Sequence, residues 1–120
     1  MGGDMRVLVC GGRNYNDSIR ISTVLTELDL TRPFTALIHG GASGADRIAG
    51  KWATAGGLTV ESYPAEWGKF GYAAGPKRNA QMLAEGKPDI VVAFPGGKGT
   101  ADMVRRAKAA GVEVMEISLD

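Results

Sequence analysis

The sequence predicts an α/β fold, namely a single compact Rossmann-like domain of three layers with a five-stranded, mainly parallel sheet and four helices. Short apolar runs rich in β-branched residues alternate along the chain with segments whose apolar residues recur at helical spacing. The first four runs end at glycine or proline, which is typical of tight connections. A chain of 120 residues, 44% of them apolar, fits one domain with its own core. Parallel strands need right-handed crossovers, which would place helices on both faces of the sheet.

Each predicted helix has a start signal as well as an apolar face. Asp17 can cap the first helix, and Ser43 with Asp46 fits a capping box at the start of the second. Pro76 suits the first turn of the third helix, and Thr100 can cap the fourth. The predicted strands cover residues 5–10, 35–39, 58–63, 89–94 and 112–117, and the last of them alternates like an edge strand.

Two segments are assigned to neither helix nor strand. Residues 64–75 show no periodicity and are predicted to form a loop of about a dozen residues, a length that is usually functional or mobile in a small domain. Residues 1–4 are expected to be a disordered or vector-derived end, which leaves residues 5–120 as the single domain.

Composition excludes several classes of protein. Fourteen basic and thirteen acidic residues give a net charge of +1, which argues against strong binding to nucleic acid or to acidic membranes. Cys10 and His39 are alone of their kind and cannot build a structural zinc site, so we expect both to be structural and predict no metal or cofactor. Apolar runs of about four or five residues predict neither a transmembrane helix nor a signal peptide, and hence a cytoplasmic location.

Eighteen of the 120 residues are glycine, about twice the usual share of about 7%. Most follow predicted strands, and two glycine-rich turns, residues 40–46 and 95–100, lead directly into predicted helices. Bare backbone and a helix N-terminus attract an anion, most often phosphate, although such glycines also simply permit tight turns. Neither turn is a Walker A loop, and G-x-G-x-x-G is absent after the first strand, which disfavours a dinucleotide dehydrogenase.

Ligands of open parallel sheets bind beyond the carboxyl ends of the strands, so the candidate site is taken from the residues that follow each strand. Trp67 and Tyr72 could stack on a base, or else cover the sheet edge or an oligomer contact. Basic and acidic residues are mixed in these segments, which favours a small anionic ligand over a polymer. The predicted ligand-binding residues are Gly11, Gly12, Arg13, Gly40, Gly41, Ser43, Gly44, Asp46, Trp67, Tyr72, Arg78, Asn79, Pro95, Gly96, Gly97, Lys98, Gly99 and Thr100.

Five segments in this order resemble the SLOG superfamily, and most closely its small YspA-type branch. They are Gly11–Arg13, His39–Asp46, Pro64–Trp67, Gly75–Asn79 and Phe94–Thr100, and the resemblance extends over about residues 5–117. It implies a Rossmann-like fold and a nucleotide or a nucleotide-derived ligand.

The lonely-guy phosphoribohydrolases of this superfamily carry Arg-Lys-x-x-Met followed by Pro-Gly-Gly-x-Gly-Thr-x-x-Glu. Here Arg78 and Met82 match, but Asn79 replaces the lysine and Met103 stands in place of the glutamate. Loss of a leaving group from ribose builds oxocarbenium character, and a carboxylate stabilises it or helps water to attack, whereas methionine can do neither. The resemblance therefore implies the fold and the ligand class but not the hydrolase activity. The catalytic residues are left unknown, with Asp102, Asp46 and Arg78 as candidates.

Three functions follow from these observations. The first is a binding or sensing module for a phosphate-bearing nucleotide derivative. The second is an N-glycoside hydrolase or transferase acting on a nucleoside monophosphate or an ADP-ribose-like substrate. The third is binding of single-stranded DNA, since residues 40–46 also resemble the DNA-processing protein A family, although the near-neutral charge disfavours it. Small residues at 49–50 and 107–111 permit close helix approach, and a homodimer or larger homo-oligomer is predicted.

Overall fold

Five parallel strands form the central sheet in the order β3-β2-β1-β4-β5 in the computed structural model, which describes residues 5–119. The predicted parallel sheet is confirmed. Strands β3, β4 and β5 are one residue shorter at each end than predicted, and β2 begins one residue earlier. The predicted N-terminal end, residues 1–4, lies outside the described residues. The strands are β1 (Met5–Cys10), β2 (Phe34–His39), β3 (Thr59–Ser62), β4 (Ile90–Ala93) and β5 (Glu113–Glu116).

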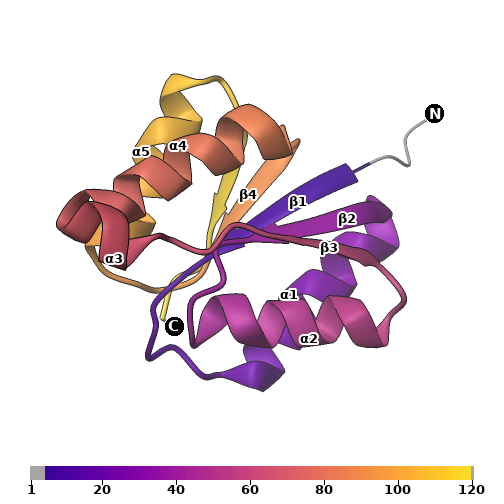
Figure 1. Cartoon of the computed structure of the whole chain (residues 1–120). Helices are drawn as coiled ribbons and strands as arrows, with labels where there is room; N and C mark the ends of the chain where they lie inside the picture. Colours follow the sequence, from indigo (N-terminus) through magenta and orange to yellow (C-terminus); the bar gives the residue numbers. More distant parts are fainter. Residues whose placement is uncertain (1–4, 120) are drawn as a thin grey trace.

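Two helices cover each face of the sheet, which makes the predicted three layers (Figure 1). Along β1 the side chains alternate between the faces, so Val7 and Val9 meet α1 and α2 while Leu8 and Cys10 meet α4 and α5. The four long helices are α1 (Ser18–Thr31), α2 (Ala45–Ala55), α4 (Ala74–Gly86) and α5 (Lys98–Ala109). Among residues 5–119 no helix is long and apolar enough to cross a membrane.

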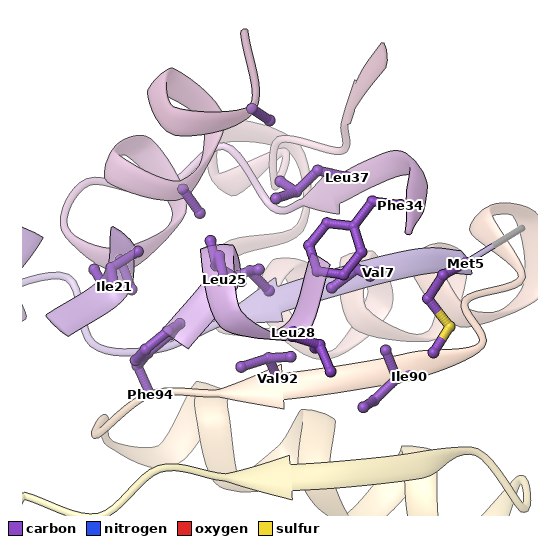
Figure 2. Packing of buried hydrophobic residues seen from close by; sticks show 14 residues of the cluster. Met5, Val7, Ile21, Leu25, Leu28, Phe34, Leu37, Ile90, Val92 and Phe94 are labelled. Atoms are coloured by element: carbon purple, nitrogen blue, oxygen red, sulfur yellow. The ribbon is translucent and has the colours of Figure 1, made fainter. Parts of the chain in front are cut away.

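The larger core lies under α1 and α2 (Figure 2). Ile21, Leu25 and Leu28 of α1 are spaced by four and three residues, so they form one stripe that faces the sheet. The buried face of α2 consists of Ala45, Ala49 and Ala53, whose small side chains permit a close approach to the strands. This close approach brings the start of α2 against the end of β1, where the candidate site lies.

The start of α1 is capped as predicted, because the Asp17 carboxylate accepts a 3.0 Å hydrogen bond from the Arg20 amide. The other two capping predictions are wrong. Helix α2 begins after Gly44 rather than after Ser43, whose hydroxyl donates to the Arg13 carbonyl oxygen instead. Helix α5 begins after Gly97, so Thr100 lies inside its first turn.

The predicted loop of residues 64–75 contains regular structure, which corrects the sequence prediction. A single helical turn, α3 (Trp67–Phe70), is followed by a 3-10 turn, η1 (Gly71–Ala73), and α4 begins directly after it. The amides of Lys69 and Phe70 both donate to the Glu66 carbonyl oxygen at 3.0 Å. An element this short has no second turn, so it leaves no periodic pattern in the sequence.

Candidate functional site

A cavity of about 710 Å³ lies at the carboxyl ends of β1 and β4. The chain leaves β1 toward α1 and leaves β4 toward α5, on opposite faces of the sheet, and the strand order changes direction between these two strands. Diverging connections of this kind open a crevice, where open α/β sheets bind their ligands. The cavity's volume falls in the range typical of small-molecule sites.

Most of the predicted ligand-binding residues line this cavity, and so do all three catalytic candidates. The predicted residues that line it are Gly11, Gly12, Arg13, Asp46, Trp67, Tyr72, Arg78, Asn79, Gly97, Lys98, Gly99 and Thr100, joined by the candidate Asp102. Six predicted residues lie outside it. A smaller neighbouring hollow is bordered by Gly40, Gly41 and Ser43, and another hollow, on the far side of the β4 turn, is bordered by Pro95 and Gly96. Gly44 packs against the turn after β1. Sequence reasoning missed Cys10, Ala42, Gly75, Pro76 and Met82.

The turn after β4 presents free backbone to the cavity. The first helical hydrogen bond of α5 runs from the Ala101 amide to the Gly97 carbonyl oxygen at 3.0 Å, so the amides of residues 98–100 have no acceptor within the helix. No side chain caps this end. A Cβ added at Gly97 or at Gly99 would meet nothing within 4 Å, which leaves this backbone open to a ligand.

The turn after β2 carries as many glycines as the turn after β4, but several of its amides are bound within the protein. Its amides already have protein acceptors: Gly40 and Ala42 donate to Asp46 Oδ2 at 3.0 and 3.2 Å, and Gly41 donates to His39 Nδ1 at 2.9 Å. The first amide of α2, that of Ala45, donates to the Gly12 carbonyl oxygen at 3.2 Å. Four amides at this turn, those of Gly40, Gly41, Ala42 and Ala45, are therefore bound within the protein and are not free for a ligand.

The glycines between these turns allow the loops to interlock. The Gly12 amide donates to the Pro95 carbonyl oxygen at 2.8 Å, and a Cβ at Gly96 would lie 2.7 Å from the Gly12 nitrogen. A Cβ at Gly11 would lie 2.6 Å from the Ala45 Cβ. These contacts join the ends of β1, β4 and α2, and they fix the floor of the cavity.

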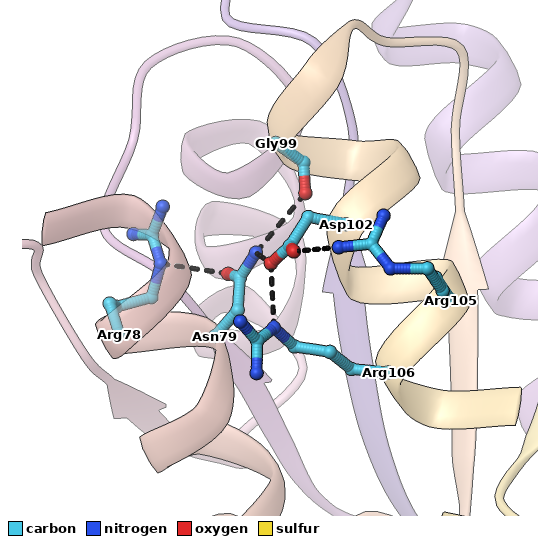
Figure 3. A network of polar contacts seen from close by, with 6 residues as sticks. All are labelled: Arg78, Asn79, Gly99, Asp102, Arg105 and Arg106. Atoms are coloured by element: carbon cyan, nitrogen blue, oxygen red, sulfur yellow. Dashed lines mark hydrogen bonds and ion pairs between the residues drawn. The ribbon is translucent and has the colours of Figure 1, made fainter. Parts of the chain in front are cut away.

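A polar network holds α4 against α5 beside the cavity (Figure 3). Asn79 Nδ2 donates to Asp102 Oδ2 at 3.0 Å and to the Gly99 carbonyl oxygen at 3.1 Å. Arg106 Nε donates to the same carboxylate at 2.8 Å, and Arg105 donates to its other oxygen. Burial alone would raise the pKa of Asp102, but the hydrogen bonds from Asn79 and Arg106 and the charges of Arg106 and Arg105 outweigh it, so this pKa is lowered. The charge of the Asp102 carboxylate is therefore balanced by Arg105 and Arg106, and its contact with Asn79 joins α5 to α4.

Met103 is not among the residues that line the cavity. Its side chain is fully buried among Leu8, Met82 and Val91 on the α4 and α5 side of the sheet. Position 103, where the lonely-guy enzymes have their glutamate, therefore contributes to the core in this chain.

Arg78 spans the ends of β2 and β3. Its Nη1 donates to the Gly40 and Tyr63 carbonyl oxygens, and its Nε donates to Asn79 Oδ1 at 3.0 Å. A Cβ at Gly40 would lie 2.3 Å from the same Nη1, so glycine is required here to admit the guanidinium. Arg78 therefore provides a fixed, half-buried positive charge at the cavity wall.

Aromatic and basic side chains form the outer wall. The Arg13 guanidinium lies over the Trp67 ring, 4.9 Å from its centroid, and the ring packs on Gly75. Tyr72 is fully exposed, and Lys98 is exposed at the start of α5. This wall offers flat apolar surface beside positive charge.

Cys10 and His39 lie at the ends of β1 and β2, and burial changes the pKa of both side chains. Burial raises the pKa of the Cys10 thiol to about 12, so it is not a thiolate nucleophile at neutral pH. The His39 ring packs on Gly50, and burial with the nearby Arg78 charge lowers its pKa. In residues 5–119 no three His, Cys, Asp or Glu side chains gather closely enough to hold a metal ion.

Asp46→Asn is expected to raise the free energy of unfolding at pH 7.5 and to change it much less at pH 4.5. Burial raises the pKa of Asp46 from 3.8 to about 6, although the amides of Ala42 and Gly40 and the Arg78 charge oppose this shift. Between these pH values the folded protein retains a proton that the unfolded chain has released, so stability falls as the pH rises. The full effect is about 3 kcal/mol. Urea unfolding of both proteins at the two pH values measures it, and parallel pH profiles would contradict it.

A protein family, a phage protein and a solved structure are among those that resemble this chain. The family described as "YspA, cpYpsA-related SLOG family" matches residues 5–70. The Gene 61 protein of Mycobacterium phage D29 is 36% identical over 118 aligned residues, which cover 92% of this chain and 94% of that protein. A crystal structure of UDP-N-acetylglucosamine 2-epimerase superposes on 95% of this chain with a TM-score of 0.61 and 14% identity. The chain spans 33% of that structure's length, and the likeness is one of fold alone.

Proposed function

This chain belongs to the YspA, cpYpsA-related SLOG family, and we propose that it binds a phosphate-bearing nucleotide or nucleotide derivative in the cavity between the ends of β1 and β4. In this proposal the protein is a binding or sensing module. The phosphate lies against the start of α5, and the base lies near Trp67 and Tyr72.

The observation that carries the proposal is the uncapped start of α5 at the cavity. Three consecutive amides, those of residues 98–100, have no acceptor within the helix, and Gly97 and Gly99 leave the space before them open. A helix N-terminus with free amides favours an anion, and the Lys98 ammonium adds positive charge beside it. Phosphate offers several acceptor oxygens and so fits this donor set.

The outer wall supports a nucleotide rather than free phosphate. Trp67 and Tyr72 provide ring faces on which a base can stack, and the Arg13 guanidinium already stacks on Trp67. A cavity of about 710 Å³ is larger than an inorganic anion requires.

The hydrolase and DNA-binding alternatives have less support. Met103 is buried in the core and Asp102 accepts from three side chains, which leaves Asp46 as the carboxylate candidate, and two backbone amides already hold one of its oxygens. A net charge of +1 offers little attraction to a polynucleotide.

Gly99→Asp is expected to weaken nucleotide binding by tenfold or more and to leave the protein folded. The new carboxylate places negative charge where the phosphate would bind, yet an acidic residue in the first helical turn stabilises a helix. Gly99→Asn adds nearly the same volume without charge and is the matched control, so it should retain more affinity. Calorimetric titration with AMP, ADP, adenosine and inorganic phosphate measures the effect. Unchanged AMP binding in Gly99→Asp would contradict the phosphate site, and failure of every nucleotide to bind would contradict the function.

A further inference from the structure

The Asp46 carboxylate has one oxygen that the protein uses and one that it leaves free. Asp46 is only 5% exposed. Its Oδ2 accepts from the Gly40 and Ala42 amides, whereas its Oδ1 accepts from no group in the described part of the chain. A carboxylate oxygen that has no donor within the protein takes its hydrogen bonds from water or from a ligand.

The free oxygen opens onto the cavity. Within residues 5–119 no side-chain oxygen or nitrogen is both fully buried and without a partner, so Oδ1 is accessible. The cavity is the hollow that Asp46 lines, and the rest of the residue is covered. A bound molecule can therefore reach this oxygen.

The chemistry of Asp46 selects a donor and not an anion. At neutral pH the carboxyl is mainly ionised, because its pKa of about 6 lies below 7, and an ionised carboxylate only accepts hydrogen bonds. The groups around it are the amides of Gly40 and Ala42 on one oxygen and the Arg78 charge at the cavity wall. A single free oxygen suits one hydroxyl or N–H donor.

The place of Asp46 at the start of α2 favours a hydroxyl close to the phosphate. Asp46 follows β2 and the amide donors of residues 98–100 follow β4, with β1 between those strands. The Ala45 amide donates to the Gly12 carbonyl oxygen and the Gly12 amide donates to the Pro95 carbonyl oxygen, so the turn after β1 links the start of α2 to the β4 turn. Asp46 and residues 98–100 line the same cavity, so a nucleotide held there by its 5′-phosphate can present a sugar hydroxyl to Asp46. The base faces Trp67 and Tyr72 in the proposed pose.

We propose that Asp46 Oδ1 accepts a hydrogen bond from a sugar hydroxyl of the bound nucleotide, so that the site selects ribonucleotides over deoxyribonucleotides. This rests on the proposed function, because it takes the phosphate to lie at the start of α5. It adds a residue that determines specificity and names the ligand class as one with a free ribose hydroxyl.

The test is a double-mutant-type cycle, in which the affinity is measured with and without the ligand hydroxyl and with and without the Asp46 carboxylate. The tightest binder among AMP, GMP, CMP and UMP is compared with its 2′-deoxy and 3′-deoxy forms, on the unchanged protein and on Asp46→Asn. The amide of Asp46→Asn keeps an oxygen for the Gly40 and Ala42 amides and presents an NH₂ group in place of Oδ1, so the fold is retained. Asp29→Asn is the matched control, because Asp29 accepts from the Phe34 amide at 2.8 Å at the opposite end of the sheet.

The unchanged protein and Asp29→Asn should bind the ribonucleotide at least about tenfold more tightly than one of the deoxy forms, as expected for a hydrogen bond to a charged group. In Asp46→Asn that ratio should fall to about threefold or less. Equal binding of all three nucleotides, or an equal loss for all three in Asp46→Asn, overturns the inference, while Gly99→Asp still reports on the phosphate site. No binding of any ribonucleotide overturns the proposed function and this inference with it.

Discussion

Met103→Glu is expected to lose about 4 kcal/mol or more of folding free energy at pH 7 and to gain no hydrolase activity. The Met103 side chain is fully buried in an apolar cluster with Leu8, Met82 and Val91. A carboxylate without a partner in such a place is among the most destabilising substitutions. Because small domains have a total stability of about 5–15 kcal/mol, much of the protein would be unfolded.

Three comparisons separate charge from shape in this prediction. Met103→Leu should cost less than about 1.5 kcal/mol, since it nearly conserves volume. Met103→Gln should fall between Leu and Glu, because its amide is polar but uncharged. Met103→Glu should recover part of its stability at pH 4, where the buried acid is protonated. Thermal and urea unfolding measure these differences. A stable Met103→Glu protein that releases free base from AMP would show that position 103 can reach the ligand.

The burial of Met103 illustrates how much of the fold could be predicted from the sequence. The alternation of strand and helix patterns predicted the sheet, its two covered faces and the end of the sheet at which the cavity lies, because each of these follows from local periodicity and turn chemistry. The sequence also indicated that Met103 is buried, since a methionine four residues before Ala107 fits the apolar face of a helix.

Helix starts were harder to predict, because the same side chains serve distant partners. Ser43 and Asp46 match a capping box, but Asp46 turns back to the amides of Gly40 and Ala42. Thr100 matches a cap and lies within the helix instead. Local sequence gives the capacity of a side chain to accept a hydrogen bond, whereas the tertiary fold decides which amide it meets.

Lining residues without distinctive chemistry also escaped prediction. Ala42, Gly75 and Met82 line the cavity through shape alone, and small or apolar side chains carry no signal of a site. The glycines pose the same difficulty, because a glycine that faces a ligand and one that faces another loop are identical in sequence. Gly97 is open while Gly96 would collide with Gly12, although the two are adjacent.

Gly44→Ala is expected to destabilise the protein by about 4 kcal/mol, since it combines two separate penalties. Gly44 has a φ of +74°, a backbone conformation that costs other residues about 1–3 kcal/mol. A Cβ there would also lie 2.3 Å from the Gly12 carbonyl oxygen and 2.5 Å from that of Arg13, and backbone atoms cannot move aside cheaply. Overpacking of this kind costs about 1–3 kcal/mol more.

Three other glycines separate the two penalties. Gly57 has a φ of +77° and open space around it, so Gly57→Ala should show the backbone strain alone. Gly11→Ala should show the collision alone, because its Cβ would lie 2.6 Å from that of Ala45. Gly97→Ala meets neither condition and should change the stability by less than about 0.5 kcal/mol. If Gly44→Ala loses no more than Gly57→Ala in urea unfolding, the turns after β1 and β2 are not held in contact, and the rigid floor argued for the cavity would have to be abandoned.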